Sequence, residues 1–199
     1  MSDNLIMSQH QNSPSGVRRI HPHKFTMWVA MGGICMMFAG LTSAYIVKRN
    51  QSNWQDFDLP VVFWYSTAVI LLSSFTIQMA VKSFKAREIS RYKSYITVTA
   101  ILGVLFTVLQ LAGFNNLKQH GIQLTGQGSN AAASFLLVIT GLHIVHVLGG
   151  VVALLIVFAR IFNTKIKSYS STTIEIVSTY WHFVDVLWIY LFIFFMWIR

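Results

Sequence analysis

The sequence YWHFVDVLW, residues 180–188, lies inside the last of five long apolar runs of this chain. It places His182 and Asp185 three residues apart, so on a helix the two side chains share one face. The residues around them are Ile, Val, Leu, Phe and Trp, which are typical of a membrane-spanning helix. An ionisable side chain at the centre of a bilayer costs about 2.5–3.5 kcal/mol on insertion scales. We therefore expect this pair to have an interhelical partner or a function.

The composition predicts an integral membrane protein. Of the 199 residues, 54% are hydrophobic and 11% are charged, whereas a soluble domain has about 25% charged residues. The net charge of +9 comes from basic residues in loops beside apolar runs, so it indicates contact with lipid headgroups and no nucleic acid. Cys35 is the only cysteine, which excludes an intramolecular disulfide or a cysteine-based metal site.

The apolar runs predict an all-α fold, a bundle of five transmembrane helices, because each run is long enough to cross a bilayer. The expected spans are approximately 25–47, 61–81, 95–114, 132–159 and 174–198, which together form a membrane domain at 25–199. Residues 1–24 are polar and predict a tail, and the first span is expected to be retained without cleavage. Gly40 and Ala44 form a small-xxx-small pair, which usually marks close packing between helices.

The loop charges predict a cytoplasmic N-terminus and a C-terminus outside. In this orientation the cytoplasmic segments contain 11 of the 15 Lys and Arg residues. These residues are Arg18, Arg19, Lys24, Lys82, Lys85, Arg87, Arg91, Lys93, Arg160, Lys165 and Lys167.

His143 and His146 lie at positions i and i+3 of the fourth span and so share one helical face. One interpretation is a pair of metal or haem ligands. A bis-His haem takes its ligands from opposite sides, however, and a non-haem metal would also need His182 and Asp185. The other interpretation, which we favour, is that each imidazole forms a hydrogen bond across the bundle. Glycines at 141, 149 and 150 would then let another helix approach closely.

The pair in the last span also has two interpretations. His182 and Asp185 form either a proton relay or an intramembrane pair that fixes two helices, and we favour the second because one carboxylate and one imidazole make no path across a bilayer. Glu175 lies seven residues before His182, on the same face and near the cytoplasmic boundary. We expect it to meet Arg160, either as a lipid-headgroup site or as a simple interfacial salt bridge.

Several motifs resemble subunit III of the haem–copper terminal oxidases. The stretch 180–188 with Glu175 resembles the final helix of that family, and TGLHIVHVLGG at 140–150 with Arg160 resembles its penultimate helix. Further matches are Phe106-Thr107 with Gln110, Leu71-Leu72-Ser73-Ser74, and Phe38-Ala39-Gly40-Leu41. The resemblance covers approximately residues 22–199.

The resemblance implies a non-catalytic subunit of a respiratory oxygen reductase in the inner membrane of a bacterium. Such a subunit binds no haem or copper, which lie in partner subunits. It packs directly on subunit I, belongs with subunit II, other oxidase subunits and respiratory supercomplexes, and holds phospholipids. It also supports proton uptake and sustained turnover. The electron donor is either cytochrome c or a quinol. By position, Arg160, Glu175 and His182 are lipid-site or packing residues.

Two departures from the family limit what can be transferred. The long family form has seven helices and this chain has five, and two membrane acids of the family correspond here to Ile34 and Gly113. The alternatives are an accessory subunit of a nitric-oxide-reductase-like complex, a b-haem quinol enzyme subunit that uses His143, His146 and His182, and an autonomous transporter.

Overall fold

The computed structural model describes residues 22–50, 54, 57–126, 129–163 and 171–198, with side chains omitted at 22–23, 160–163 and 171–172. The described chain forms the helices α1 (Pro22–Lys48), α2 (Val62–Lys85), α3 (Ile89–Gln119), α4 (Ala131–Asn163) and α5 (Ser171–Trp197). All five are long and apolar enough to cross a membrane. The prediction of an all-helical bundle with five spans is confirmed. The helices continue past several predicted ends, most clearly where α3 begins at Ile89 rather than at residue 95.

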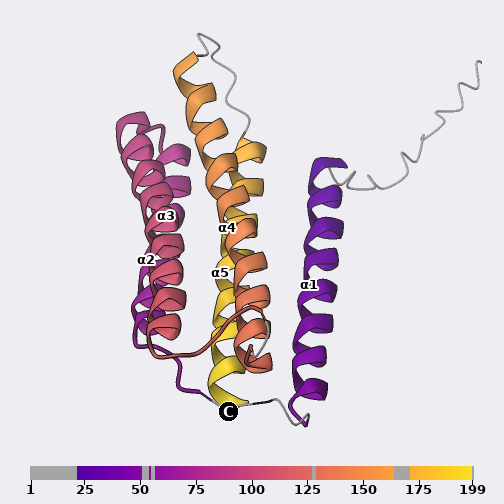
Figure 1. Cartoon of the computed structure of the whole chain (residues 1–199). Coiled ribbons are helices and arrows are strands. Elements are labelled where there is room, and N and C mark those ends of the chain that lie inside the picture. The colour runs from indigo at the N-terminus through magenta and orange to yellow at the C-terminus, as the bar shows by residue number, and fades with distance from the viewer. Residues whose placement is uncertain (1–21, 51–53, 55–56, 127–128, 164–170, 199) are drawn as a thin grey trace, which may run out of the picture.

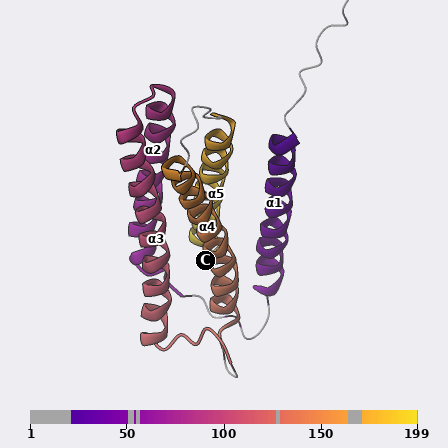
Figure 2. The same ribbon diagram turned by 90° about the horizontal axis from the view of Figure 1, so that it is seen from above.

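The bundle has three layers. Figures 1 and 2 show α4 and α5 in the middle, with the α2–α3 hairpin on one side and α1 on the other. Within the described part of the chain, α1 contacts α4 and α5 but neither α2 nor α3. The most extensive helix–helix contact joins α2 to α3, as expected for two antiparallel helices with a short connection.

Side-chain hydrogen bonds connect α2 to α5 over about two helical turns. Three α5 side chains bond hydroxyls of α2: Trp188 Nε1 to Thr67 Oγ1 at 3.0 Å, Trp181 Nε1 to Ser73 Oγ at 3.0 Å, and His182 Nδ1 with Ser74 Oγ at 2.7 Å. Two further bonds connect α2 to α3: Gln110 Nε2 to Ser66 Oγ at 2.7 Å, and Thr76 Oγ1 with Thr99 Oγ1 at 2.8 Å. The hydroxyls of α2 therefore align this helix with both of its neighbours.

The indole of Trp181 fills a space that two glycines leave open. A Cβ built at Gly103 of α3 would lie 2.7 Å from Trp181 Cη2, and one at Gly150 of α4 would lie 3.1 Å from the same ring. The prediction of close approach is confirmed for Gly150. It is wrong for Gly141 and Gly149, where a Cβ would meet nothing within 4 Å. A methyl group at either glycine would therefore touch no other described helix.

Gly40 likewise does not pack on another described helix, since a Cβ there would meet nothing within 4 Å. Its expected partner within the bundle is therefore not seen. α1 instead contacts the core through the opposite side of the helix, where Met31, Phe38, Thr42 and Tyr45 are buried.

Candidate functional site

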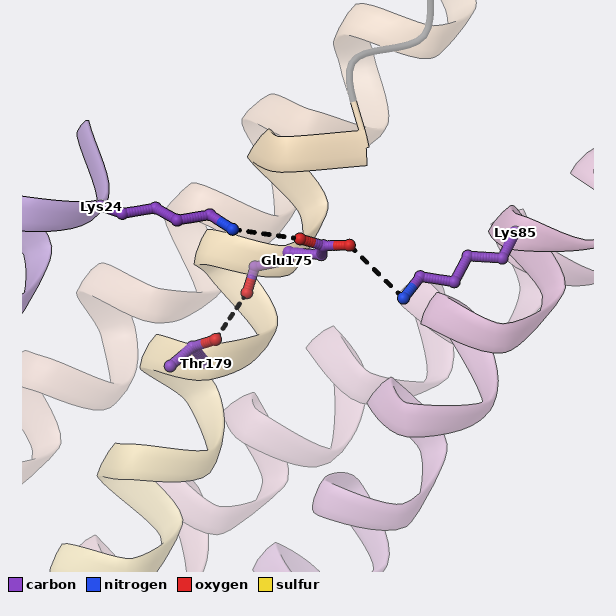
Figure 3. A network of polar contacts seen from close by, with 4 residues as sticks. All are labelled: Lys24, Lys85, Glu175 and Thr179. Carbon is purple, nitrogen blue, oxygen red and sulfur yellow. Dashed lines mark hydrogen bonds and ion pairs between the residues drawn. The ribbon is translucent and has the colours of Figure 1, made fainter. Parts of the chain in front are cut away.

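The first turns of α5 carry a charged cluster that joins three helices. The carboxylate of Glu175 lies 3.4 Å from Lys24 Nζ of α1 and 3.4 Å from Lys85 Nζ of α2 (Figure 3). The Thr179 hydroxyl donates to the backbone carbonyl of Glu175 at 2.8 Å. These side chains are 35–60% exposed, so each ion pair contributes at most about 1 kcal/mol. The predicted contact of Glu175 with Arg160 concerns a side chain outside the described residues.

A pocket of about 360 Å³ lies beside this cluster. Its lining combines charged and hydroxyl groups with apolar side chains: Lys24, Met27, Trp28, Val81, Glu175, Ile176, Ser178 and Thr179. The lining thus combines polar groups, here called the rim, with apolar side chains, here called the wall, and it comes from α1, α2 and α5. This combination suits an amphipathic molecule, with a charged end at the rim and a hydrocarbon chain along the wall.

His182 and Asp185 share one face of α5 but differ in their contacts. The half-buried His182 bonds Ser74 of α2, which is the kind of interhelical contact that we favour for this pair. Asp185 is only 2% exposed, and neither carboxyl oxygen has a hydrogen-bond partner among the described residues. The Ser74 side chain also lies near the Asp185 carboxyl, but no hydrogen bond joins the two among the described residues. The structure therefore brings both groups next to one α2 hydroxyl, which is bonded to the histidine.

We predicted that the imidazoles of His143 and His146 form hydrogen bonds across the bundle, but the described residues show no such bond. The His146 Nδ1 atom lies 2.7 Å from the Leu142 carbonyl oxygen of its own helix. His143 is fully buried, and neither ring nitrogen has a partner in the described part of the chain. No described side chain therefore bonds His143 directly, and aromatic rings pack around it: the ring centroids of Phe38, Phe106 and Trp188 lie 6.3, 5.7 and 5.2 Å away.

The described residues do not assemble the ligand set that a metal site would need. They contain no group of three or more His, Cys, Asp or Glu side chains placed to hold a metal ion. Three aromatic rings also pack against His143 from α1, α3 and α5, so a haem could reach this imidazole only after those rings had moved.

Sequence reasoning missed several contacts. The sequence places Lys24 and Lys85 at the same end of the bundle as Glu175. It does not show that these two, among the basic residues at that end, are the ones that pair with Glu175. The contact of Thr42 with the Tyr190 hydroxyl, at 3.1 Å, joins α1 to α5. The bond from Gln110 to Ser66 joins α3 to α2. A polar residue inside an apolar run indicates that such a contact exists, but it does not indicate which residue is the partner.

Comparison with known proteins identifies the family. The model of the family "cytochrome c oxidase subunit III" matches residues 50–199. The chain belongs to this family.

Curated relatives agree with the family match. The probable cytochrome c oxidase subunit 3 of Mycobacterium tuberculosis is 32% identical over 185 residues, which span 87% of this chain and 90% of that protein. The cytochrome c oxidase subunit 3 of Corynebacterium diphtheriae is 33% identical over 166 residues, 79% of each chain. The cytochrome bo(3) ubiquinol oxidase subunit 3 of Pseudomonas aeruginosa is 26% identical over 200 residues, 94% of each chain. The resemblance seen in the sequence motifs is therefore confirmed.

The structure shows what surrounds Gly113 and Ile34, the two positions at which the sequence departs from the family resemblance. A Cβ at Gly113 would lie 2.7 Å from Phe63 Cε2 of α2, so an acidic side chain at this position would displace a fully buried ring. Ile34 is partly buried and packs against the hydrophobic core. Both positions at which the resemblance predicts an acid are thus used for apolar packing.

A double-mutant cycle tests the fit between Gly113 and Phe63. We expect Gly113→Ala to lower the free energy of unfolding, because the new methyl group must displace the phenyl ring. Phe63→Leu should then cost less in the Gly113→Ala background than in the wild-type chain. Gly149→Ala is the matched control, since its methyl group would meet nothing within 4 Å. Equal costs of Phe63→Leu in both backgrounds, measured by denaturant unfolding, would contradict the fit.

Proposed function

We propose that this chain is the non-catalytic subunit III of a respiratory haem–copper oxygen reductase. The observation that carries the proposal is the family match over residues 50–199. The relatives named above, which are oxidase subunits 3, support it as well. In this proposal the haem and copper lie in partner subunits, and the chain supports proton uptake and sustained turnover while oxygen is reduced to water.

The proposed direct partner is subunit I, together with subunit II and further subunits of the complex. Support comes from the apolar surface of α1, which packs on α4 and α5 along one side only. The large side chains exposed on this helix are Phe25, Trp28, Val29, Met36, Ile46 and Val47. Such a surface is covered by lipid or by the helices of another subunit.

The proposed orientation places the N-terminus in the cytoplasm, the C-terminus outside, and the chain in the bacterial inner membrane. The described basic residues support it by their distribution. One end of the bundle carries Lys24, Lys82, Lys85, Arg87, Arg91 and Lys93, and the other carries Lys48, Arg49 and Lys118. An excess of Lys and Arg marks the cytoplasmic side of a membrane protein.

The pocket beside Glu175 is the proposed phospholipid site. Its rim contains the Lys24 ammonium, which can bind a phosphate, and its wall contains Met27, Val81 and Ile176, which suit an acyl chain. Trp28 adds an amphipathic ring of the kind that lies at headgroup level. The electron donor is decided by the partner subunits, and the relatives named above include both a cytochrome c oxidase and a ubiquinol oxidase subunit.

Purification of the native complex tests the assignment. An affinity tag on this chain should recover oxidase subunits I and II, identified by mass spectrometry, together with the haem spectrum and oxygen consumption of the complex. After the chain is separated from its partners, the haem should stay with them. Recovery of the chain alone with stoichiometric haem, or of a complex that reduces nitric oxide but not oxygen, would overturn the assignment.

Substitution of Lys24 tests the lipid site. We expect Lys24→Gln to lower the amount of phospholipid that copurifies with the complex, because the ammonium at the rim is lost. Lys82→Gln is the matched control, since Lys82 is exposed near the same end of the bundle but does not line the pocket. Equal phospholipid in both variants, measured by quantitative lipid mass spectrometry, would count against the site while leaving the subunit assignment intact.

A further inference from the structure

Three fully buried polar residues of α3 and α4 have side-chain atoms without hydrogen-bond partners among the described residues. Gln110 Oε1, Thr140 Oγ1 and both ring nitrogens of His143 lack hydrogen bonds within the described part of the chain. The three side chains are 1%, 0% and 0% exposed. Buried polar atoms in native proteins nearly always have a hydrogen-bond partner, either in the protein or in ordered water.

The helix register brings Gln110 and Thr140 to neighbouring turns, and His143 lies one turn further along α4. α3 and α4 run in opposite directions (Figure 1). Phe106 of α3 faces His143 of α4, with ring centroids 5.7 Å apart. Gln110 lies one turn beyond Phe106, and Thr140 lies one turn before His143. Because the helices are antiparallel, these two turns are neighbours.

The orientation of the Gln110 side-chain amide limits where a partner of its Oε1 atom can lie. Gln110 Nε2 donates to Ser66 Oγ of α2 at 2.7 Å, which fixes the plane of the amide. Its Oε1 atom must then find a donor on another side of the residue. Thr140 offers a hydroxyl and His143 offers a ring N–H, and both lie on the face of α4 that is turned to the core.

We propose that ordered water occupies the centre of the bundle and bridges Gln110 Oε1, Thr140 Oγ1 and the His143 imidazole. A buried water typically makes about three hydrogen bonds, and these three residues supply both donors and acceptors. The water joins α3 to α4 and connects both to α2 through Ser66. Aromatic rings enclose this site on the His143 side, where Trp188 and Phe106 lie 5.2 and 5.7 Å from the imidazole.

The most direct test is a cryo-EM map of the intact complex at a resolution that shows ordered water. The expected result is density within about 3.2 Å of Gln110 Oε1 and of at least one of Thr140 Oγ1 and the His143 nitrogens. A dry centre, in which these side chains bond one another or helix carbonyls directly, would overturn the proposal.

The isosteric substitution Thr140→Val distinguishes a dry site from a water-filled site in solution. If the site is dry, Thr140→Val removes an unsatisfied hydroxyl and should leave the Tm unchanged or raise it. If water bridges the residues, the same change removes one of its partners, and we expect the Tm of the chain in the complex to fall by about 2–4 °C. Thr97→Val is the control, because this exposed hydroxyl bonds the Lys93 carbonyl of its own helix and no side chain of another described helix.

The combination of both substitutions shows whether the two residues share the water. We expect Thr140→Val and His143→Leu to be non-additive in Tm, because the first change already removes the shared bridge. Additive effects, or a Tm that rises with Thr140→Val, would overturn the proposal. The map and the Tm series use the same purified complex.

Discussion

Along the α2–α5 interface, the indole N–H groups of Trp181 and Trp188 donate to Ser73 and Thr67 at 3.0 Å. Inside a bilayer, burial of apolar surface does not drive helices together, because lipid chains are as apolar as leucine. Hydrogen bonds and close packing therefore decide how the helices align. The two indoles supply both, since Trp181 also fills the space left by Gly103 and Gly150. The position of α5 relative to α2, α3 and α4 depends on these rings.

This alignment of α5 positions the residues of functional interest. It places Glu175 between Lys24 and Lys85 at one end of the bundle, and it places His182 beside Ser74 further along. Contacts of α1 with the bundle are fewer, and they include the ion pair at Lys24 and the Thr42–Tyr190 hydroxyl contact. A helix attached in this way can present its outer side to lipid or to a neighbouring subunit, which is the role we propose for it.

The sequence predicted the spans well because length and apolarity alone decide whether a helix can cross a bilayer. The motifs at 140–150 and 180–188 also pointed to the family, because a sequence motif can be recognised without knowing which side chains it contacts. Partner choice was harder to predict. Gly141, Gly149 and Gly150 look alike in sequence, yet among the described residues only Gly150 packs closely on another helix, since helix rotation decides which face meets Trp181. His143 was expected to bond across the bundle, but aromatic rings occupy its surroundings.

We expect the indole–hydroxyl bonds between α5 and α2 to stabilise the bundle. A double-mutant cycle of Ser73→Ala and Trp181→Phe, followed by unfolding in mixed detergent micelles, measures this contribution. We predict a coupling free energy of about 0.6 kcal/mol, and at most about 1.7 kcal/mol, as for other side-chain bonds between membrane helices. The control cycle replaces Ser73→Ala with Ser43→Ala, an exposed serine of α1, and should be additive. Additivity of Ser73→Ala with Trp181→Phe would contradict the account.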